Sequence, residues 1–154
     1  MKTTIAFVVV SVAGLALARS EPAGPEHAGY RTWQATTAEP YTMLDAADCR
    51  PGNQPLGPHQ GRYIRVFVNG PGRDAIGTAK PYPVGSVIVK EKLLKRDDAT
   101  PNELGIMIKR ESGWEYKFIG ADGKLAEGNN VNSCETCHAR AKHDSVFIAA
   151  WERK

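Results

Sequence analysis

Four segments of this chain have the pattern of β-strands, and they constrain the fold more than any other feature. They alternate apolar and polar residues or carry runs of β-branched residues, and turns rich in Gly, Pro or Asp separate them; they lie at 61–69, 85–94, 104–110 and 114–119. Apolar residues fall on both faces around 87–89, which predicts burial of that strand on both sides. We therefore expect a mainly β (α+β) fold built on an antiparallel sheet of four to five strands.

Short helices are expected before and after this sheet. Residues 29–37 hold two aromatic residues three positions apart, which favours a short helix, and Pro40 is suited to the first turn of a second one. After the sheet, Asn132 is a good N-cap residue and Glu135 follows three positions later, in the capping-box arrangement. The sequence thus predicts a C-terminal helix that starts near Asn132.

This predicted helix contains a single C-x-x-C-H motif, formed by Cys134, Cys137 and His138. Two thiols at this spacing can each add to a vinyl group of haem, and the following imidazole can bind the iron, so the motif is typical of c-type haem attachment. A redox dithiol and half of a zinc site are the alternatives, but the sequence shows neither an early βαβ pattern nor a second pair of zinc ligands. We expect one covalently attached haem c per chain, bound by Cys134 and Cys137, with His138 as the iron ligand.

The N-terminus has the pattern of a cleaved secretory signal peptide. Residues 1–18 combine Lys2, an apolar stretch too short to span a bilayer comfortably, and a small-x-small site that ends at Ala18. We expect a flexible lead at 19–28 and a single haem domain at 29–154. Export and haem attachment support each other, because bacteria attach haem c outside the inner membrane. The sequence therefore predicts a periplasmic protein.

Charge and composition argue against two classes of partner. The formal net charge is only +3 and the basic residues are scattered, so no nucleic-acid partner is expected. Beyond the signal peptide no stretch is apolar enough for stable membrane insertion. Cys49 is the odd thiol, and both a small buried residue and an intermolecular disulfide stay open for it.

Several motifs taken together resemble the cytochrome P-460 family, which includes the cytochrome c′-beta proteins. The motifs are IRVFVN at 64–69, YPVGSVIVKE at 82–91, GWEY at 113–116, CETCH at 134–138 and DSVF at 144–147, and the resemblance extends over roughly residues 30–153. The resemblance implies a mostly β homodimer with one c-type haem per chain. It also implies that His138 is the proximal ligand and that the other face of the iron is open to small ligands.

The two branches of this family imply different functions. In the P-460 branch a strand lysine, which corresponds to Lys90 here, bonds covalently to the haem edge, and the enzyme oxidises hydroxylamine or nitric oxide and passes electrons to a soluble cytochrome. In the c′-beta branch the bond is absent, and a hydrophobic pocket binds nitric oxide or carbon monoxide without turnover. Lys90 as an ordinary solvated strand lysine also stays open. A third hypothesis is simple electron transfer, in which Met107 is a second ligand of the iron. The alternative for Met107 is an ordinary residue of the hydrophobic core.

The sequence departs from the P-460 enzymes at two positions of the distal pocket. Ile64 stands where those enzymes carry an arginine, and the neighbouring Arg65 should face the opposite side of the sheet. Gly105 or Ile106 stands where they carry a carboxylate. A distal acid accepts protons from hydroxylamine as electrons leave it. Whether this chain is an enzyme, a haem-dependent oxidoreductase, is therefore left open by its sequence.

Overall fold

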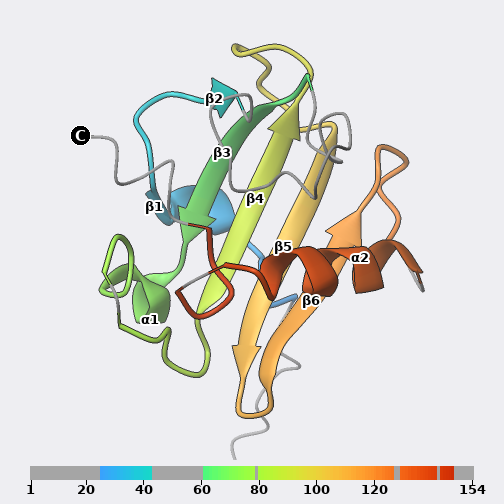
Figure 1. The fold of residues 1–154 in the computed structure, drawn as a ribbon. Coiled ribbons are helices and arrows are strands. Elements are labelled where there is room, and N and C mark those ends of the chain that lie inside the picture. Colours follow the sequence, from blue (N-terminus) through green and yellow to red (C-terminus); the bar gives the residue numbers. More distant parts are fainter. Residues whose placement is uncertain (1–24, 43–60, 79, 127–128, 142, 148–154) are drawn as a thin grey trace, which may run out of the picture.

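The computed structural model describes residues 25–42, 61–78, 80–126, 129–141 and 143–147. Within them one antiparallel sheet is accompanied by three short helical elements (Figure 1). The helical elements are a 3-10 helix η1 (Tyr30–Thr32), α1 (Gly70–Arg73) and α2 (Asn129–His138). The strands are β1 (Gln34–Ala35), β2 (Tyr41–Thr42), β3 (Tyr63–Val68), β4 (Val87–Leu93), β5 (Glu103–Arg110) and β6 (Gly113–Ile119). The predicted mainly β fold is confirmed.

The sheet follows the chain in a simple meander. Its order is β1-β3-β4-β5-β6, and β2 also pairs with β3, so that both two-residue strands cover one edge. All pairs are antiparallel, and only two residues separate β5 from β6. The four long strands match the four predicted segments to within two residues at each end.

The central strand β4 is buried on both faces, as its sequence predicts. On one face a core cluster surrounds Ile64, Val66, Ile88 and Met107. On the other face a second cluster contains Val87, Val89, Ile106 and Ile108, with Tyr30 and Trp33 packed against it. We call the first the helix face, because α2 contacts β6 there, and the second the N-terminal face, because η1 covers it.

The N-terminal segment differs from the predicted pair of helices. Between residues 25 and 42 only Tyr30–Thr32 is helical, and Gln34–Ala35 is already a strand. Beyond Pro40, Tyr41–Thr42 is also a strand, so a second helix opened by Pro40 is wrong within the described residues. The physical reason is the edge of β3, whose backbone groups would otherwise lack partners. Pairing with this edge outweighs the weak local helix signal.

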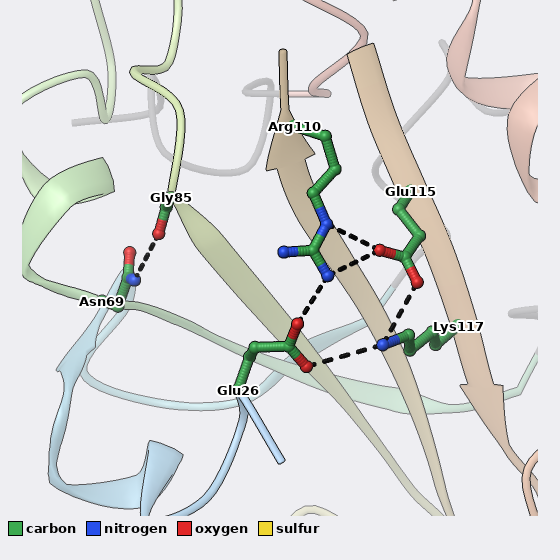
Figure 2. Close-up of polar contacts among 6 residues, drawn as sticks. All are labelled: Glu26, Asn69, Gly85, Arg110, Glu115 and Lys117. Carbon is green, nitrogen blue, oxygen red and sulfur yellow. Dashed lines mark hydrogen bonds and ion pairs between the residues drawn. The ribbon is translucent and has the colours of Figure 1, made fainter. Parts of the chain in front are cut away.

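A short helix fixes the connection between β3 and β4. The Asn69 side chain accepts a hydrogen bond from the Gly72 backbone N–H and donates one to the Gly85 carbonyl at 2.9 Å (Figure 2). Gly72 is buried against β3, and a Cβ there would lie 2.7 Å from a Val68 methyl group. The backbone can approach the strand this closely only because the residue is glycine.

The helix α2 crosses the sheet over β5 and β6 (Figure 1). It begins at Asn129, three residues before the predicted N-cap, so Asn132 lies inside the helix and its carbonyl accepts a hydrogen bond from the Thr136 hydroxyl. No helix among the described residues is long and apolar enough to cross a membrane. The signal peptide at 1–18 lies outside the described residues. The predicted lead is described only from Pro25, where Glu26 pairs with Arg110 and Lys117 (Figure 2).

Candidate functional site

One face of α2 carries all three residues of the C-x-x-C-H motif. Cys134, Cys137 and His138 are half-buried, whereas the helix residues between and just before them are exposed, namely Asn132, Ser133, Glu135 and Thr136. Side chains three and four positions apart share one side of a helix, which explains this grouping. Both thiols are free of disulfide bonds. The motif therefore presents two thiols and an imidazole together toward the sheet.

The imidazole of His138 is held by aromatic rings and by one hydrogen bond. Its ring centroid lies 5.4 Å from that of Tyr116 on β6 and 5.2 Å from that of Phe147 in the segment after α2. Its Nδ1 lies 2.8 Å from the Ser145 carbonyl oxygen. Because a carbonyl can only accept, Nδ1 must carry the proton and donate it. In the neutral ring the lone pair is therefore on Nε2.

Electrostatics keep this ring neutral. Burial, together with the nearby positive charge of Lys90, lowers the pKa of His138 to about 4, against a smaller opposing effect of the Ser145 carbonyl. At neutral pH the imidazole is thus uncharged, with Nδ1 occupied and Nε2 available as a metal ligand. This is the protonation state that an axial iron ligand requires.

The effect of its charge on the pKa of His138 indicates that Lys90 lies near the histidine. It projects from β4 to the helix face, between Val66 of β3 and Gly105 of β5, and it is half-buried. A Cβ at Gly105 would lie 3.5 Å from the Lys90 Cε, an ordinary van der Waals distance, so the lysine stem lies directly over Gly105. Lys90 and the C-x-x-C-H motif, 44 to 48 positions apart in the chain, therefore lie on the same side of the sheet.

The two departures from the P-460 pattern have clear positions in the structure. Arg65 projects to the N-terminal face, where it binds the buried carboxylate of Glu91 at 3.3 Å. Gly105 lies opposite Lys90, and Ile106 belongs to the core of the N-terminal face. A carboxylate does occur on the helix face two residues before Gly105, but Glu103 forms an ion pair with the buried Lys92 at 2.9 Å. The residues next to Lys90 on the neighbouring strands are thus apolar.

The donor set fits a haem iron better than an isolated metal ion. Among the described residues no group of three or more His, Cys, Asp or Glu side chains is placed to hold a metal. A neutral imidazole and two thiols free of disulfides on one helix face are the groups that haem c attachment uses. Met107 is almost fully buried in the core cluster of the helix face. Cys49 lies outside the described residues.

The sequence patterns did not identify the residues that hold His138. Ser145 and Phe147 lie in the DSVF segment, which is part of the family resemblance but has no local pattern that points to the histidine. Tyr116 lies on a strand with three aromatic residues at alternate positions, and this pattern does not distinguish a core residue from one beside a haem. One sequence signal could have found them. DSVF begins six residues after His138, which is close enough for a tight turn after the helix to bring it back to the histidine.

Comparison with protein families gives one match. The family model described as Cytochrome P-460 matches residues 27–148, which is most of the chain. No curated protein matched the chain. The matched region contains the whole described sheet, α2 and the segment that contacts His138.

Proposed function

The chain belongs to the cytochrome P-460 family, and from this premise we propose an exported c-type cytochrome that carries one covalently bound haem per chain and binds a small nitrogen-oxide ligand at its iron. Family membership itself indicates a haem-binding cytochrome. Covalent attachment through Cys134 and Cys137, the axial role of His138, export and the ligand are parts of the proposal.

The observation that carries the proposal is the state of His138. A buried histidine that is neutral, with Nδ1 donating to a backbone carbonyl, is prepared to bind a metal through Nε2. The two thiols on the same helix face would hold the porphyrin beside it. The haem would supply a redox-active iron, and the chain would orient it and exclude water from one side through Tyr116 and Phe147.

The position of Lys90 supports an enzymatic role. Its ammonium group lies close enough to His138 to lower the pKa of that residue, so it is on the side of the sheet where the haem would bind. We propose that Lys90 bonds to the haem edge and that the iron oxidises hydroxylamine or nitric oxide, with the electrons passing to a soluble cytochrome. By family resemblance the protein would act as a homodimer.

A second candidate, capture of nitric oxide or another diatomic gas without turnover, is favoured by one specific observation. The residues beside Lys90 on the neighbouring strands are Val66 and Gly105, and Arg65 is engaged by Glu91 on the opposite face. An apolar pocket excludes water from a bound gas but offers no base for hydroxylamine oxidation. The two candidates therefore differ in whether turnover occurs.

One set of holoproteins separates these functions. Three proteins are compared: the wild type, Lys90→Ala, and Lys92→Ala as a matched control on the same face of β4. The ferrous absorption spectrum of each is recorded. Each is also digested, and the digest is searched for a peptide from β4 that is joined to the haem peptide. A joined peptide and a red-shifted Soret band that Lys90→Ala alone abolishes, together with hydroxylamine-dependent reduction of a soluble cytochrome, support the enzyme. An ordinary high-spin spectrum that responds to nitric oxide without turnover supports gas capture.

A sharp low-spin spectrum that neither ligand alters would contradict both candidates and leave simple electron transfer.

The export part of the proposal has a separate measurement. Sequencing of the secreted protein is expected to show Arg19 as the first residue, and retention of residues 1–18 would contradict a cleaved signal peptide.

A further inference from the structure

The segment after α2 has an unusual backbone at the point where it meets His138. Asp144 has φ 47° and Ser145 has φ 60°, and they are the non-glycine residues with a left-handed backbone within the described part of the chain. This conformation is unfavourable for residues with a Cβ and persists only where surrounding contacts hold it. The contacts that hold it here are therefore informative about function.

Asp144 is bound at three points to three different parts of the fold. Its Oδ1 forms an ion pair with Lys109 Nζ of β5 at 2.6 Å, and its Oδ2 accepts from the Tyr82 backbone N–H at 2.8 Å. Its carbonyl oxygen accepts from Trp114 Nε1 of β6 at 2.7 Å. Lys109 Nζ also lies 5.1 Å from the centre of the Trp114 ring. We call these contacts of Asp144, with Lys109, Tyr82 and Trp114, the Asp144 clamp.

The clamp determines where the next peptide group lies. The Ser145 carbonyl, one residue further on, is the acceptor for His138 Nδ1 at 2.8 Å. The turn closes with a hydrogen bond from the Val146 N–H to the His143 carbonyl, and Val146 is buried in the core of the helix face. The sheet, the clamp and the histidine thus form one continuous chain of contacts.

We propose that Asp144, paired with Lys109, is a positioning residue that fixes the Ser145 carbonyl against His138 and thereby sets the orientation and electron density of the iron ligand. This inference rests on the proposed function, in which His138 binds the haem iron. A hydrogen bond at the far nitrogen makes an imidazole a stronger donor to its metal, so loosening the clamp weakens the bond from Nε2 to iron. Asp144 acts through Ser145 and does not itself touch the iron ligand.

The test uses the haem-loaded protein and two spectroscopic readouts, the iron–histidine stretching frequency of the ferrous form by resonance Raman and the midpoint potential. Lys109→Met removes the ion pair but keeps the aliphatic stem on Trp114, and Asp144→Asn keeps an acceptor for Tyr82. Both are expected to lower the stretching frequency and raise the potential. Lys109→Arg, which restores the charge, is expected to return both values toward the wild type.

The matched control is Lys117→Met, which breaks ion pairs with Glu115 and Glu26 on the opposite face of β6. It is expected to leave both readouts unchanged even if it lowers stability. If Lys109→Met folds, carries haem and keeps the wild-type stretching frequency and midpoint potential, this inference is overturned while the proposed function still stands. A wild-type chain that carries no haem would contradict the proposed function and this inference together.

Discussion

The buried carboxylate of Glu91 is predicted to be a main stabilising group of the fold. Its side chain is 0% exposed and accepts hydrogen bonds from Tyr30 Oη at 2.7 Å, Arg31 Nε at 2.7 Å and Arg65 Nη1 at 3.3 Å. Glu91→Gln keeps one acceptor oxygen but turns an N–H₂ group toward one of the donors. Loss of one or two charge-assisted hydrogen bonds, at about 1.5–3 kcal/mol each, gives an expected cost of about 3 kcal/mol.

The exposure of the two arginines limits this cost. Arg31 is 45% exposed and Arg65 is 27% exposed, so both can regain water when the carboxylate is lost. We therefore expect a loss near the lower end of the roughly 3–5 kcal/mol seen when one partner of a buried pair is removed. The measurement is urea unfolding of the haem-loaded protein, followed by far-UV circular dichroism in one oxidation state.

Glu115→Gln is the matched control for this prediction. Glu115 also pairs with an arginine and a lysine, Arg110 and Lys117, but its side chain is 38% exposed (Figure 2). Exposed pairs contribute about 1 kcal/mol or less, so this variant should remain close to the wild type. Equal losses in the two variants, or a loss below about 1 kcal/mol for Glu91→Gln, would refute the argument from burial.

Three further outcomes are expected. Gly72→Ala should cost about 2 kcal/mol in urea unfolding because its Cβ would lie 2.7 Å from a buried methyl group of β3, whereas Gly70→Ala, with nothing within 4 Å, should cost far less; equal costs would contradict this packing. Ser145→Gly should change the free energy of unfolding by no more than about 1 kcal/mol, because glycine adopts φ 60° without strain and this gain offsets the lost side-chain hydrogen bond to Tyr116; a loss above about 2 kcal/mol would contradict it. A hydrogen bond from Arg110 is the main cause that lowers the pKa of Glu26 from 4.5 to about 2, so its contribution is fully present above pH 4.5 and is lost as the pH falls through about 2; the difference in Tm between wild type and Glu26→Gln should shrink over that range, and a difference that stays constant down to pH 2 would contradict it.

The long strands could be predicted because their signal is local. Alternation within each segment specifies its faces, and it correctly placed Arg65 on the opposite side of the sheet from Ile64. Two-sided burial of β4 also followed from the apolar residues at 87–89. The N-terminal strands were not predictable in this way, because β1 and β2 consist of two residues each and exist only by pairing with β3.

The site was predictable where a motif carries it and not where contacts between distant segments build it. The C-x-x-C-H spacing is enough to place Cys134, Cys137 and His138 on one side of a helix. The Asp144 clamp joins positions as far apart as Tyr82 and Asp144, and no local pattern reports such a pairing. A left-handed backbone at two residues other than glycine is also invisible in sequence, because tertiary contacts impose it.

The most direct test of the account is the intact mass and colour of the chain produced in a host with working cytochrome c assembly machinery. We predict a coloured protein that is heavier than the mature polypeptide by one haem, and loss of that added mass under denaturing conditions when Cys134 and Cys137 are both changed to Ala in a Lys90→Ala background. A colourless wild-type chain with the mass of the bare polypeptide would contradict it.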